Sequence, residues 1–506
     1  MLKAIFKNSF AGILAQIISV VFAFLTRTFF IQYIGVELLG INSTFASILS
    51  TLSLAELGVQ SAIVYALYKP IMEKDSIKIN DIMNILKRIY SGIGIVFIAL
   101  SVAILPILKY ILKGVTMSSE IGIFFLIQML ASSASYFFSY KRALLYADQR
   151  DYISKYIDLL FSVVFNIAQI LALIIFKSYY MFLIIKVVQV FLSNITISII
   201  CKHYYPYLHR SQINKPVLKD IIKNVKNIFS GKLAAYVYSS TDNLIISAMI
   251  STVTVGYFVN YTTVTGSIKM IGNSLLAPIQ PIIGNYLART EDIRDQEKSF
   301  LKFTYVRFIL AVVLLVPMIV LIDDFITMWI GEEFLLSQTI SLLIGVDLFI
   351  HFVHSSTCEY MYGKGIFAPD KYIGLIGAVT NIVTSIVLAI FMGISGVLIG
   401  TVISQMLFWI LRSYIVYKKC FDLPKSSYLK YWIKCLVYII AFIGILFVSA
   451  YVVNFINISV LTISFIIKGI VIEGISILLV LGLFFFTREN KEIRNYILNK
   501  IKIRKA

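Results

Sequence analysis

Five charged side chains lie inside otherwise apolar runs of the sequence, and their chemistry is the most informative in the chain. Arg27, Glu56, Asp242, Lys269 and Arg307 each fall in a stretch long enough to cross a lipid bilayer. A charge at the centre of a membrane helix costs about 2.5–3.5 kcal/mol, so such residues almost always face a bundle interior or a water-filled cavity. We predict that Arg27, Lys269 and Arg307 bind an anionic substrate, while Asp242 and Glu56 carry a coupling proton or sodium ion. The alternative is a set of internal ion pairs that lock helices together, such as Glu56 with Arg27.

A second polar set follows the period of a single helix: Asp347, His351, His354 and Cys358, at positions i, i+4, i+7 and i+11. This spacing places all four on one helix face. Ligands stretched along one helix need partners from elsewhere to hold a metal, so we expect no metal site. We interpret the stripe as the lining of a cavity. Asp347 and His351 are our further candidates for ion coupling, because imidazole titrates near neutral pH.

Other charges have plainer interpretations. We expect Lys186, Lys468 and Glu473 either to extend their charged ends toward the interface or to form lipid-facing pairs. The acidic residues near one outer turn are expected to form a solvated loop: Asp323, Asp324, Glu332 and Glu333. The sequence contains no Walker lysine motif, glycine-rich phosphate loop or HExxH motif. Transport would therefore use a gradient and no bound cofactor.

The elements that hold these residues are transmembrane helices. Of the 506 residues, 59% are hydrophobic and 14% are charged, and the mean hydropathy is +0.88. Apolar runs of ~20 residues are what a membrane-spanning helix requires. Fourteen such spans fit the sequence: 9–31, 41–68, 89–112, 118–140, 153–176, 179–200, 228–250, 253–283, 303–322, 335–358, 372–392, 395–417, 431–453 and 460–486.

The distribution of basic residues orients these spans. The chain has 45 Lys and Arg and a formal net charge of +19. With both termini in the cytoplasm, the outer segments hold only Lys109, Lys113 and Lys177, and the predicted cytoplasmic segments hold most of the rest. This is the positive-inside pattern. The positive charge therefore matches the membrane and its anionic lipids, and we expect no nucleic-acid partner.

The chain also has a repeat. KNSFAG at 7–12 matches KNIFSG at 226–231, and Gly256 takes the place of Gly40 in the segments that follow. Six spans separate the two copies, so both halves have the same orientation, as in a parallel repeat. We predict an N-lobe over 1–200, a cytoplasmic amphipathic linker over 201–227, a C-lobe over 228–418, and two extra helices with a basic cytoplasmic tail over 419–506.

Two stretches, GVELLGINSTFASILSTLSLAELGVQSAIVYALYKPI and SGKLAAYVYSSTDNLIISAMISTVTVGYF, resemble the polysaccharide flippases of the multidrug/oligosaccharidyl-lipid/polysaccharide (MOP) exporter superfamily. The likeness extends over nearly the whole chain. It implies two six-helix lobes in a V around a central cavity, and transfer of undecaprenyl-diphosphate-linked oligosaccharides for capsule, exopolysaccharide or teichoic-type polymers. Arg27 and Asp242 match charged positions of that family in helices one and seven. Because Glu56 and Asp242 are acidic, the cavity would be less cationic than in relatives specialised for lipid II.

The resemblance implies a flippase in the bacterial plasma membrane that is not an enzyme. Its partners would be the lipid-linked oligosaccharide, membrane lipids and other polysaccharide assembly proteins. A cation-coupled multidrug exporter of the same superfamily is the first alternative, but Arg27, Lys269 and Arg307 do not suit its acidic, aromatic cavity. A membrane polysaccharide polymerase or glycosyltransferase is the second alternative, but the chain lacks the large outer or catalytic loop that such an enzyme needs. A scaffold in an assembly complex is the third.

Overall fold

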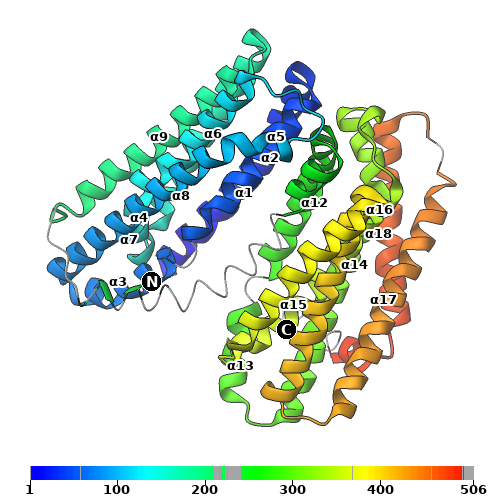
Figure 1. The fold of residues 1–506 in the computed structure, drawn as a ribbon. Helices are drawn as coiled ribbons and strands as arrows, with labels where there is room; N and C mark the ends of the chain where they lie inside the picture. Colours follow the sequence, from blue (N-terminus) through cyan, green and yellow to red (C-terminus); the bar gives the residue numbers. More distant parts are fainter. Residues whose placement is uncertain are drawn as a thin grey trace. The chain divides into compact units, whose positions relative to one another are not determined.

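The structure, a computed structural model, consists of α-helices joined by turns (Figure 1). It describes residues 2–56, 59–209, 241–276, 279–366, 368–456 and 458–492, with isolated positions between 216 and 225 and at 494. No β-strand occurs among these residues. The chain divides into two compact units, Met1–Val259 and Asn260–Ala506.

The helices of the first unit are α1 (Leu2–Ile34), α2 (Val36–Leu52), α3 (Val59–Glu73), α4 (Ser76–Ile104), α5 (Leu108–Ile111), α6 (Ser119–Phe138), α7 (Arg142–Ala147), α8 (Asp151–Phe176), α9 (Tyr179–Tyr204) and α11 (Asp242–Ile245). The boundary between the units falls inside α12 (Thr252–Leu276). The second unit continues with α13 (Ile279–Arg289), α14 (Ile293–Ile330), α15 (Gln338–Gly363), α16 (Ala368–Ile415), α17 (Lys425–Val453) and α18 (Leu461–Leu483).

The described helices agree with the predicted membrane spans. Among the described residues, ten helical segments are long and apolar enough to cross a membrane. One of them, Ala368–Cys420, contains two predicted spans, because Gly393 adopts a positive φ of 58° and interrupts the helix. The predicted span 41–68 includes α2, a turn at Ser53–Glu56 and most of α3, and the described helices within 253–283 belong to α12 and α13. The predicted all-α fold of a multi-pass membrane protein is confirmed.

The predicted span 228–250 and the part of the predicted linker beyond residue 209 fall largely outside the described residues. Within the described part, a short turn at Leu105–Ile107 contains Pro106 and separates α4 from α5. The boundary between the compact units, at Val259, lies later in the chain than the predicted start of the C-lobe at 228. The predicted division into lobes, linker and extra helices stays a prediction.

In the first unit each long helix packs along the next in a series. α1 packs along α8, α8 along α9, α9 along α6, and α6 along α4. Aromatic rings fill one end: Phe30 contacts Tyr179 and Phe182 edge to face, and Phe124 contacts Tyr179. Many of the side chains that face each other between these helices carry hydroxyl groups, and a pocket with a polar lining forms there.

The start of α12 packs against α2 through two glycines. A Cβ on Gly40 would overlap the carbonyl oxygen of Thr252 and lie 3.1 Å from the backbone nitrogen of Gly256, and a Cβ on Gly256 would overlap the carbonyl oxygen of Val36. The Thr252 amide donates to the Lys113 carbonyl at 2.9 Å. Small residues allow this close backbone approach. The two glycines that we paired as equivalent positions of the repeat therefore contact each other.

In the second unit α14 is the central helix and contacts α15, α17 and α18. Phe300 contacts the rings of Tyr360, Tyr417 and Tyr431, and all four side chains are buried. The prediction for Asp323 and Asp324 is wrong in part, because α14 extends to Ile330 and includes both residues. Asp323 accepts hydrogen bonds from Tyr261 (2.9 Å) and Ser341 (3.2 Å), and Asp324 pairs with Lys468 on α18 at 2.8 Å. These two carboxylates join helices and are not part of a solvated loop.

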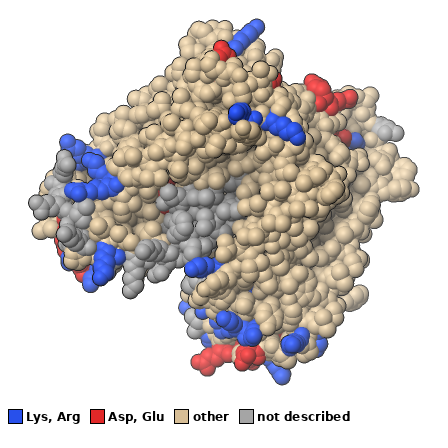
Figure 2. All heavy atoms as spheres, in the orientation of Figure 1, with Lys and Arg blue, Asp and Glu red and all other residues tan. Residues whose placement is uncertain are grey.

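Charged side chains gather at the ends of the helices, and a wide surface of uncharged residues lies between these ends (Figure 2). The uncharged surface carries many exposed large apolar side chains on the long helices, such as Val164 and Leu171 on α8 and Ile440 and Phe447 on α17. Lipid is the solvent for such a surface, so this distribution is what a multi-pass membrane protein requires.

Candidate transport site

A polar pocket lies inside the first unit among α1, α6, α7, α8 and α9 and has a volume of about 480 Å³. We call it the N-unit pocket. Its lining includes an unusual number of hydroxyl and amide side chains for a membrane helix bundle: Ser19, Ser135, Ser139, Ser162, Gln189, Ser193 and Asn194. Small hydroxyl residues permit close helix packing and supply hydrogen bonds where no bulk water is present. The pocket is therefore a partly open hollow with a largely polar lining.

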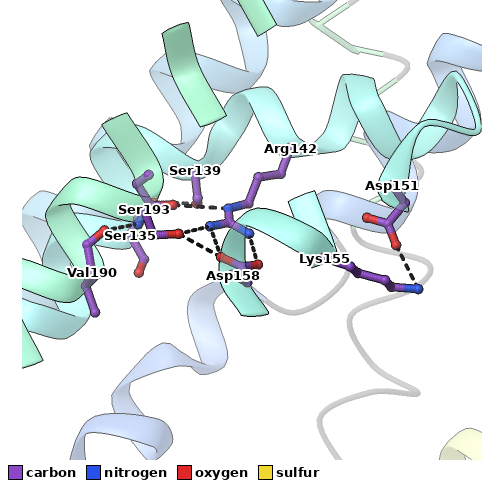
Figure 3. A network of polar contacts seen from close by, with 9 residues as sticks. Ser135, Ser139, Arg142, Asp151, Lys155, Asp158, Val190 and Ser193 are labelled. Carbon is purple, nitrogen blue, oxygen red and sulfur yellow. Dashed lines mark hydrogen bonds and ion pairs between the residues drawn. The ribbon is translucent and has the colours of Figure 1, made fainter. Parts of the chain in front are cut away.

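Arg142 and Asp158 form the centre of this pocket, and Figure 3 shows their network. Arg142 Nη1 lies 2.5 Å from Asp158 Oδ2, and Nη2 lies 2.8 Å from Oδ1, which is a bidentate pair. Ser193 donates to Asp158 Oδ1 at 2.7 Å, and Arg142 Nε donates to Asn194 Oδ1 at 3.1 Å. The pair joins α7, α8 and α9, and each partner neutralises the other.

Lys186 gives the pocket a second cation. Its Nζ contacts Gln189 Oε1 at 3.2 Å, and among the described residues no carboxylate lies within 4.0 Å of it. The lining thus carries one positive charge beyond the neutral Arg142–Asp158 pair. Such a pocket is suited to a hydroxyl-bearing group with a negative charge. Lys186, which we predicted to be lipid-facing, is exposed and borders this pocket.

The predicted site residues of the first unit lie on separate elements. Arg27 is half-buried on α1. Glu56 ends the turn after α2 and accepts a hydrogen bond from Tyr90 at 2.7 Å. Asp242 begins α11, and the adjacent Asn243 donates to a serine hydroxyl of α2 at 3.1 Å. Asp242 is therefore positioned where α11 contacts α2, and its side chain is half-buried.

In the second unit, Lys269 borders a hollow of about 440 Å³ on one face of α12. The hollow is lined by residues that repeat at helical spacing: Gly266, Lys269, Met270, Asn273 and Ser274. A cation, an amide and a hydroxyl thus share one open face of this helix. The binding role of Lys269 stays a prediction.

Arg307 is enclosed by protein and does not face such a hollow. Its Nε donates to Glu359 Oε2 at 3.0 Å, its Nη2 pairs with Glu359 Oε1, and its Nη1 donates to the Phe352 carbonyl at 3.1 Å. The Arg307 and Glu359 side chains are 5% and 12% exposed. In this structure Arg307 locks α14 to α15, which is the ion-pair alternative, and a binding role would require the pair to open.

The polar stripe lies on α15, as its spacing indicates. His354 is buried and its Nε2 lies 3.1 Å from Gln405 Oε1, which links α15 to α16. Asp347 and His351 are half-buried, and the rings of His351 and His354 are 6.1 Å apart. Among the described residues no three His, Cys, Asp or Glu side chains gather in a way that could hold a metal ion.

Sequence reasoning did not identify the N-unit pocket. A partial signal existed, because Lys186, Gln189 and Ser193 are spaced by three and four residues and share one face of α9. Asp158 also lies inside the predicted span 153–176. The pairing of Asp158 with Arg142 was not visible, because Arg142 falls just beyond the predicted span 118–140.

The comparisons with known proteins agree with this architecture. A family model described as polysaccharide biosynthesis protein matches residues 38–339. No curated relative matches the chain in sequence. Among solved structures, that of the lipid II flippase MurJ in an inward closed conformation is similar over 94% of this chain and 98% of its own, with a TM-score of 0.68 and 15% identity.

Two multidrug transporters are also similar in fold. An inward-facing MATE family transporter of the MOP superfamily has a TM-score of 0.60 and 14% identity, over 76% of this chain and 91% of its own. The MATE transporter VcmN of Vibrio cholerae, in a mutant form, has a TM-score of 0.56 and 12% identity, over 84% of this chain and 98% of its own. At these identities the likeness concerns the fold.

Proposed function

The chain belongs to the family of polysaccharide biosynthesis proteins, and from this premise we propose that it is a flippase for a lipid-linked oligosaccharide. The observation that carries the proposal is the combination of this family with a transporter fold that extends over nearly the whole chain. In a polysaccharide pathway, a protein with a transporter fold is suited to the step at which a sugar intermediate crosses the membrane. The family and the structural neighbours are transporters and flippases, so transfer of the intact molecule is proposed, with no covalent chemistry.

The proposed substrate is an undecaprenyl-diphosphate-linked oligosaccharide for capsule, exopolysaccharide or teichoic-type polymers. Its apolar tail would stay in the bilayer while the headgroup passes through a polar path between the leaflets. The proposed mechanism is alternating access between two lobes, driven by an ion gradient or by the membrane potential. The protein would lie in the bacterial plasma membrane with both termini in the cytoplasm, an orientation supported by the positive-inside pattern.

We assign headgroup binding to Arg27 and Lys269, because a diphosphate is an anion and a cation in low dielectric attracts it strongly. Arg307 would join them only in a state in which its pair with Glu359 is open. Asp242 and Glu56 remain our candidates for ion coupling. Asp347 and His351 on α15 are the corresponding candidates in the second unit.

A cation-coupled multidrug exporter is the second candidate, because multidrug transporters share the fold. The exposed face of α12 around Lys269 favours an anionic substrate over the cationic drugs that such exporters carry. The polysaccharide family match likewise favours the flippase.

Deleting the gene in its host separates the two functions. We expect loss of a surface polymer and accumulation of a complete lipid-linked oligosaccharide in the inner leaflet, measured by lipid extraction and mass spectrometry. Complementation with Arg27→Ala should restore membrane protein but not surface polymer. Unchanged polymer and intermediates, together with greater sensitivity to cationic compounds, would replace the flippase with the drug exporter.

A further inference from the structure

A second pocket lies at the end of the first unit that we predict to be cytoplasmic. Its volume is about 250 Å³, and it forms where α4, the turn after α6, and the segment after α9 meet. We call it the basic pocket. Its polar lining is cationic or uncharged and includes Asn84, Lys87, Tyr140, Lys141, Lys202 and His209. The N-unit pocket shares none of these residues.

Two asparagines fix the wall of the basic pocket. Asn80 is 3% exposed, and its Oδ1 accepts the His209 amide at 2.9 Å. Asn84 Nδ2 donates to the His209 carbonyl at 2.8 Å. Nearby, Tyr205 is buried and donates to Asp148 at 2.6 Å; burial and this carboxylate raise the pKa of Tyr205, so it stays a neutral donor. The segment after α9 is therefore held on α4, and the pocket is a formed site.

Three lysines surround this space without a counter-charge. Lys141 Nζ donates to the Ser198 carbonyl at 3.2 Å and to its hydroxyl at 2.7 Å, which leaves one of its three N–H groups. Lys87 and Lys202 are exposed. Among the described residues, no carboxylate lies within 4.0 Å of any of the three ammonium groups. Like charges gathered at one pocket repel each other, and an anion in the pocket relieves this repulsion.

Helix dipoles do not account for all three lysines. Lys202 lies in the last turn of α9, and Lys141 follows α6, so each is near a helix C-terminus where a cation is favourable. Lys87 lies in the interior of α4, far from either end of that helix, where the dipole gives no such advantage. Its position beside the other two lysines points to a shared ligand.

We propose that the basic pocket binds a diphosphate group, and that it is where the diphosphate of the lipid-linked substrate first docks at the inner leaflet. This inference rests on the proposed function. A diphosphate carries at least two negative charges, which suits three lysines better than one phosphate does. The pocket volume of about 250 Å³ greatly exceeds the ~30 Å³ of one water in the liquid, so a group of several heavy atoms fits. Tyr140 and His209 add further hydrogen-bonding groups.

Soluble diphosphates carry the same anionic group, so the experiment compares a lipid diphosphate with a soluble one. The full-length protein in nanodiscs would be titrated with inorganic pyrophosphate. Separate nanodiscs would contain undecaprenyl diphosphate or undecaprenyl monophosphate, with bound lipid measured by native mass spectrometry. We expect the lipid diphosphate to bind at least tenfold more tightly than either the lipid monophosphate or pyrophosphate. Equal binding of monophosphate and diphosphate would overturn the assignment, as would tighter binding of pyrophosphate than of the lipid.

A triple variant, Lys87→Gln, Lys141→Gln and Lys202→Gln, should weaken binding of the lipid diphosphate at least tenfold. The control is Lys69→Gln, Lys74→Gln and Lys78→Gln, which removes the same charge from the end of α3 and the start of α4, outside the pocket. We expect the control to change the affinity less than twofold. Equal affinities for both triple variants would overturn the site.

The single variant Lys87→Gln provides a second measurement if the triple variant does not fold, because Lys87 is exposed and makes no structural ion pair within the described chain. Its affinity should fall severalfold, and an unchanged affinity would count against the pocket. These outcomes are separable from failure of the proposed function. If the wild type binds no lipid diphosphate, the flippase itself is contradicted. If the wild type binds and the pocket variants bind equally well, only the basic pocket is wrong.

Discussion

Neutralising either partner of the Arg307–Glu359 pair should destabilise the second unit strongly, whereas neutralising both should not. The two side chains are 5% and 12% exposed, and the guanidinium makes two contacts with the carboxylate and one with the Phe352 carbonyl. Arg307→Met leaves the Glu359 carboxylate buried without its cation. Glu359→Leu leaves the Arg307 cation buried without its anion. Each single change therefore leaves one buried charge whose desolvation penalty is no longer offset by a partner.

The expected magnitude follows from this burial. Removing one partner of a buried pair costs about 3–5 kcal/mol, while replacing both partners with apolar side chains of similar volume is often close to neutral. At about 1.4 kcal/mol for each power of ten, each single variant should raise the unfolding equilibrium constant by roughly two to four powers of ten. The double variant Arg307→Met with Glu359→Leu should recover most of this loss.

The assay is reversible unfolding of the purified protein in mixed micelles, followed by circular dichroism, with a double-mutant cycle. The control pair is Arg488–Glu492, whose side chains are 64% and 43% exposed at i, i+4 spacing. Exposed pairs of this kind contribute about 0.3–0.5 kcal/mol. Effects of the Arg307 and Glu359 changes that are additive, or single losses no larger than in the control pair, would refute the reasoning. If the double variant is stable but does not restore surface polymer, Arg307 also has the predicted binding role.

Two further predictions test the packing and the topology. Gly40→Ala should lower the free energy of unfolding by about 1–3 kcal/mol, because its Cβ would overlap the Thr252 carbonyl. The control is Gly92→Ala, also in a helix, which has no atom within 4 Å of the added Cβ and should not destabilise the protein. Equal thermal midpoints for the two variants would contradict the close contact at Gly40. Glu332→Cys should react with a membrane-impermeant thiol reagent in intact cells and Glu73→Cys only after permeabilisation; the reverse labelling pattern would overturn the proposed orientation.

The helices were predictable because the bilayer imposes a simple rule. Each span needs ~20 apolar residues, and the chain provides such runs from end to end. The turn at Ser53–Glu56 inside the predicted span 41–68 was not predicted, because no proline or glycine pair marks it. The interruption at Gly393 was placed correctly, between the predicted spans 372–392 and 395–417.

Partners across helices were much harder to predict than the helices. Arg307 was recognised as an intramembrane charge, but Glu359 lies one residue beyond the predicted span 335–358 and was not considered as its partner. The helix continues to Gly363 and brings Glu359 within reach of Arg307. Arg142 and Asp158 were missed for a similar reason. Which side chains meet depends on helix rotation and crossing, which a single sequence does not specify.

The central claim is that this chain moves a lipid-linked oligosaccharide across the bilayer, and reconstitution tests it most directly. The purified protein would be placed in liposomes that contain a fluorescent undecaprenyl-diphosphate oligosaccharide, and a membrane-impermeant reagent would report the headgroups exposed outside. We predict that wild-type protein makes nearly all the labelled headgroups accessible, whereas protein-free liposomes and the Arg27→Ala variant expose only the outer half. Equal accessibility in all three preparations would contradict the flippase.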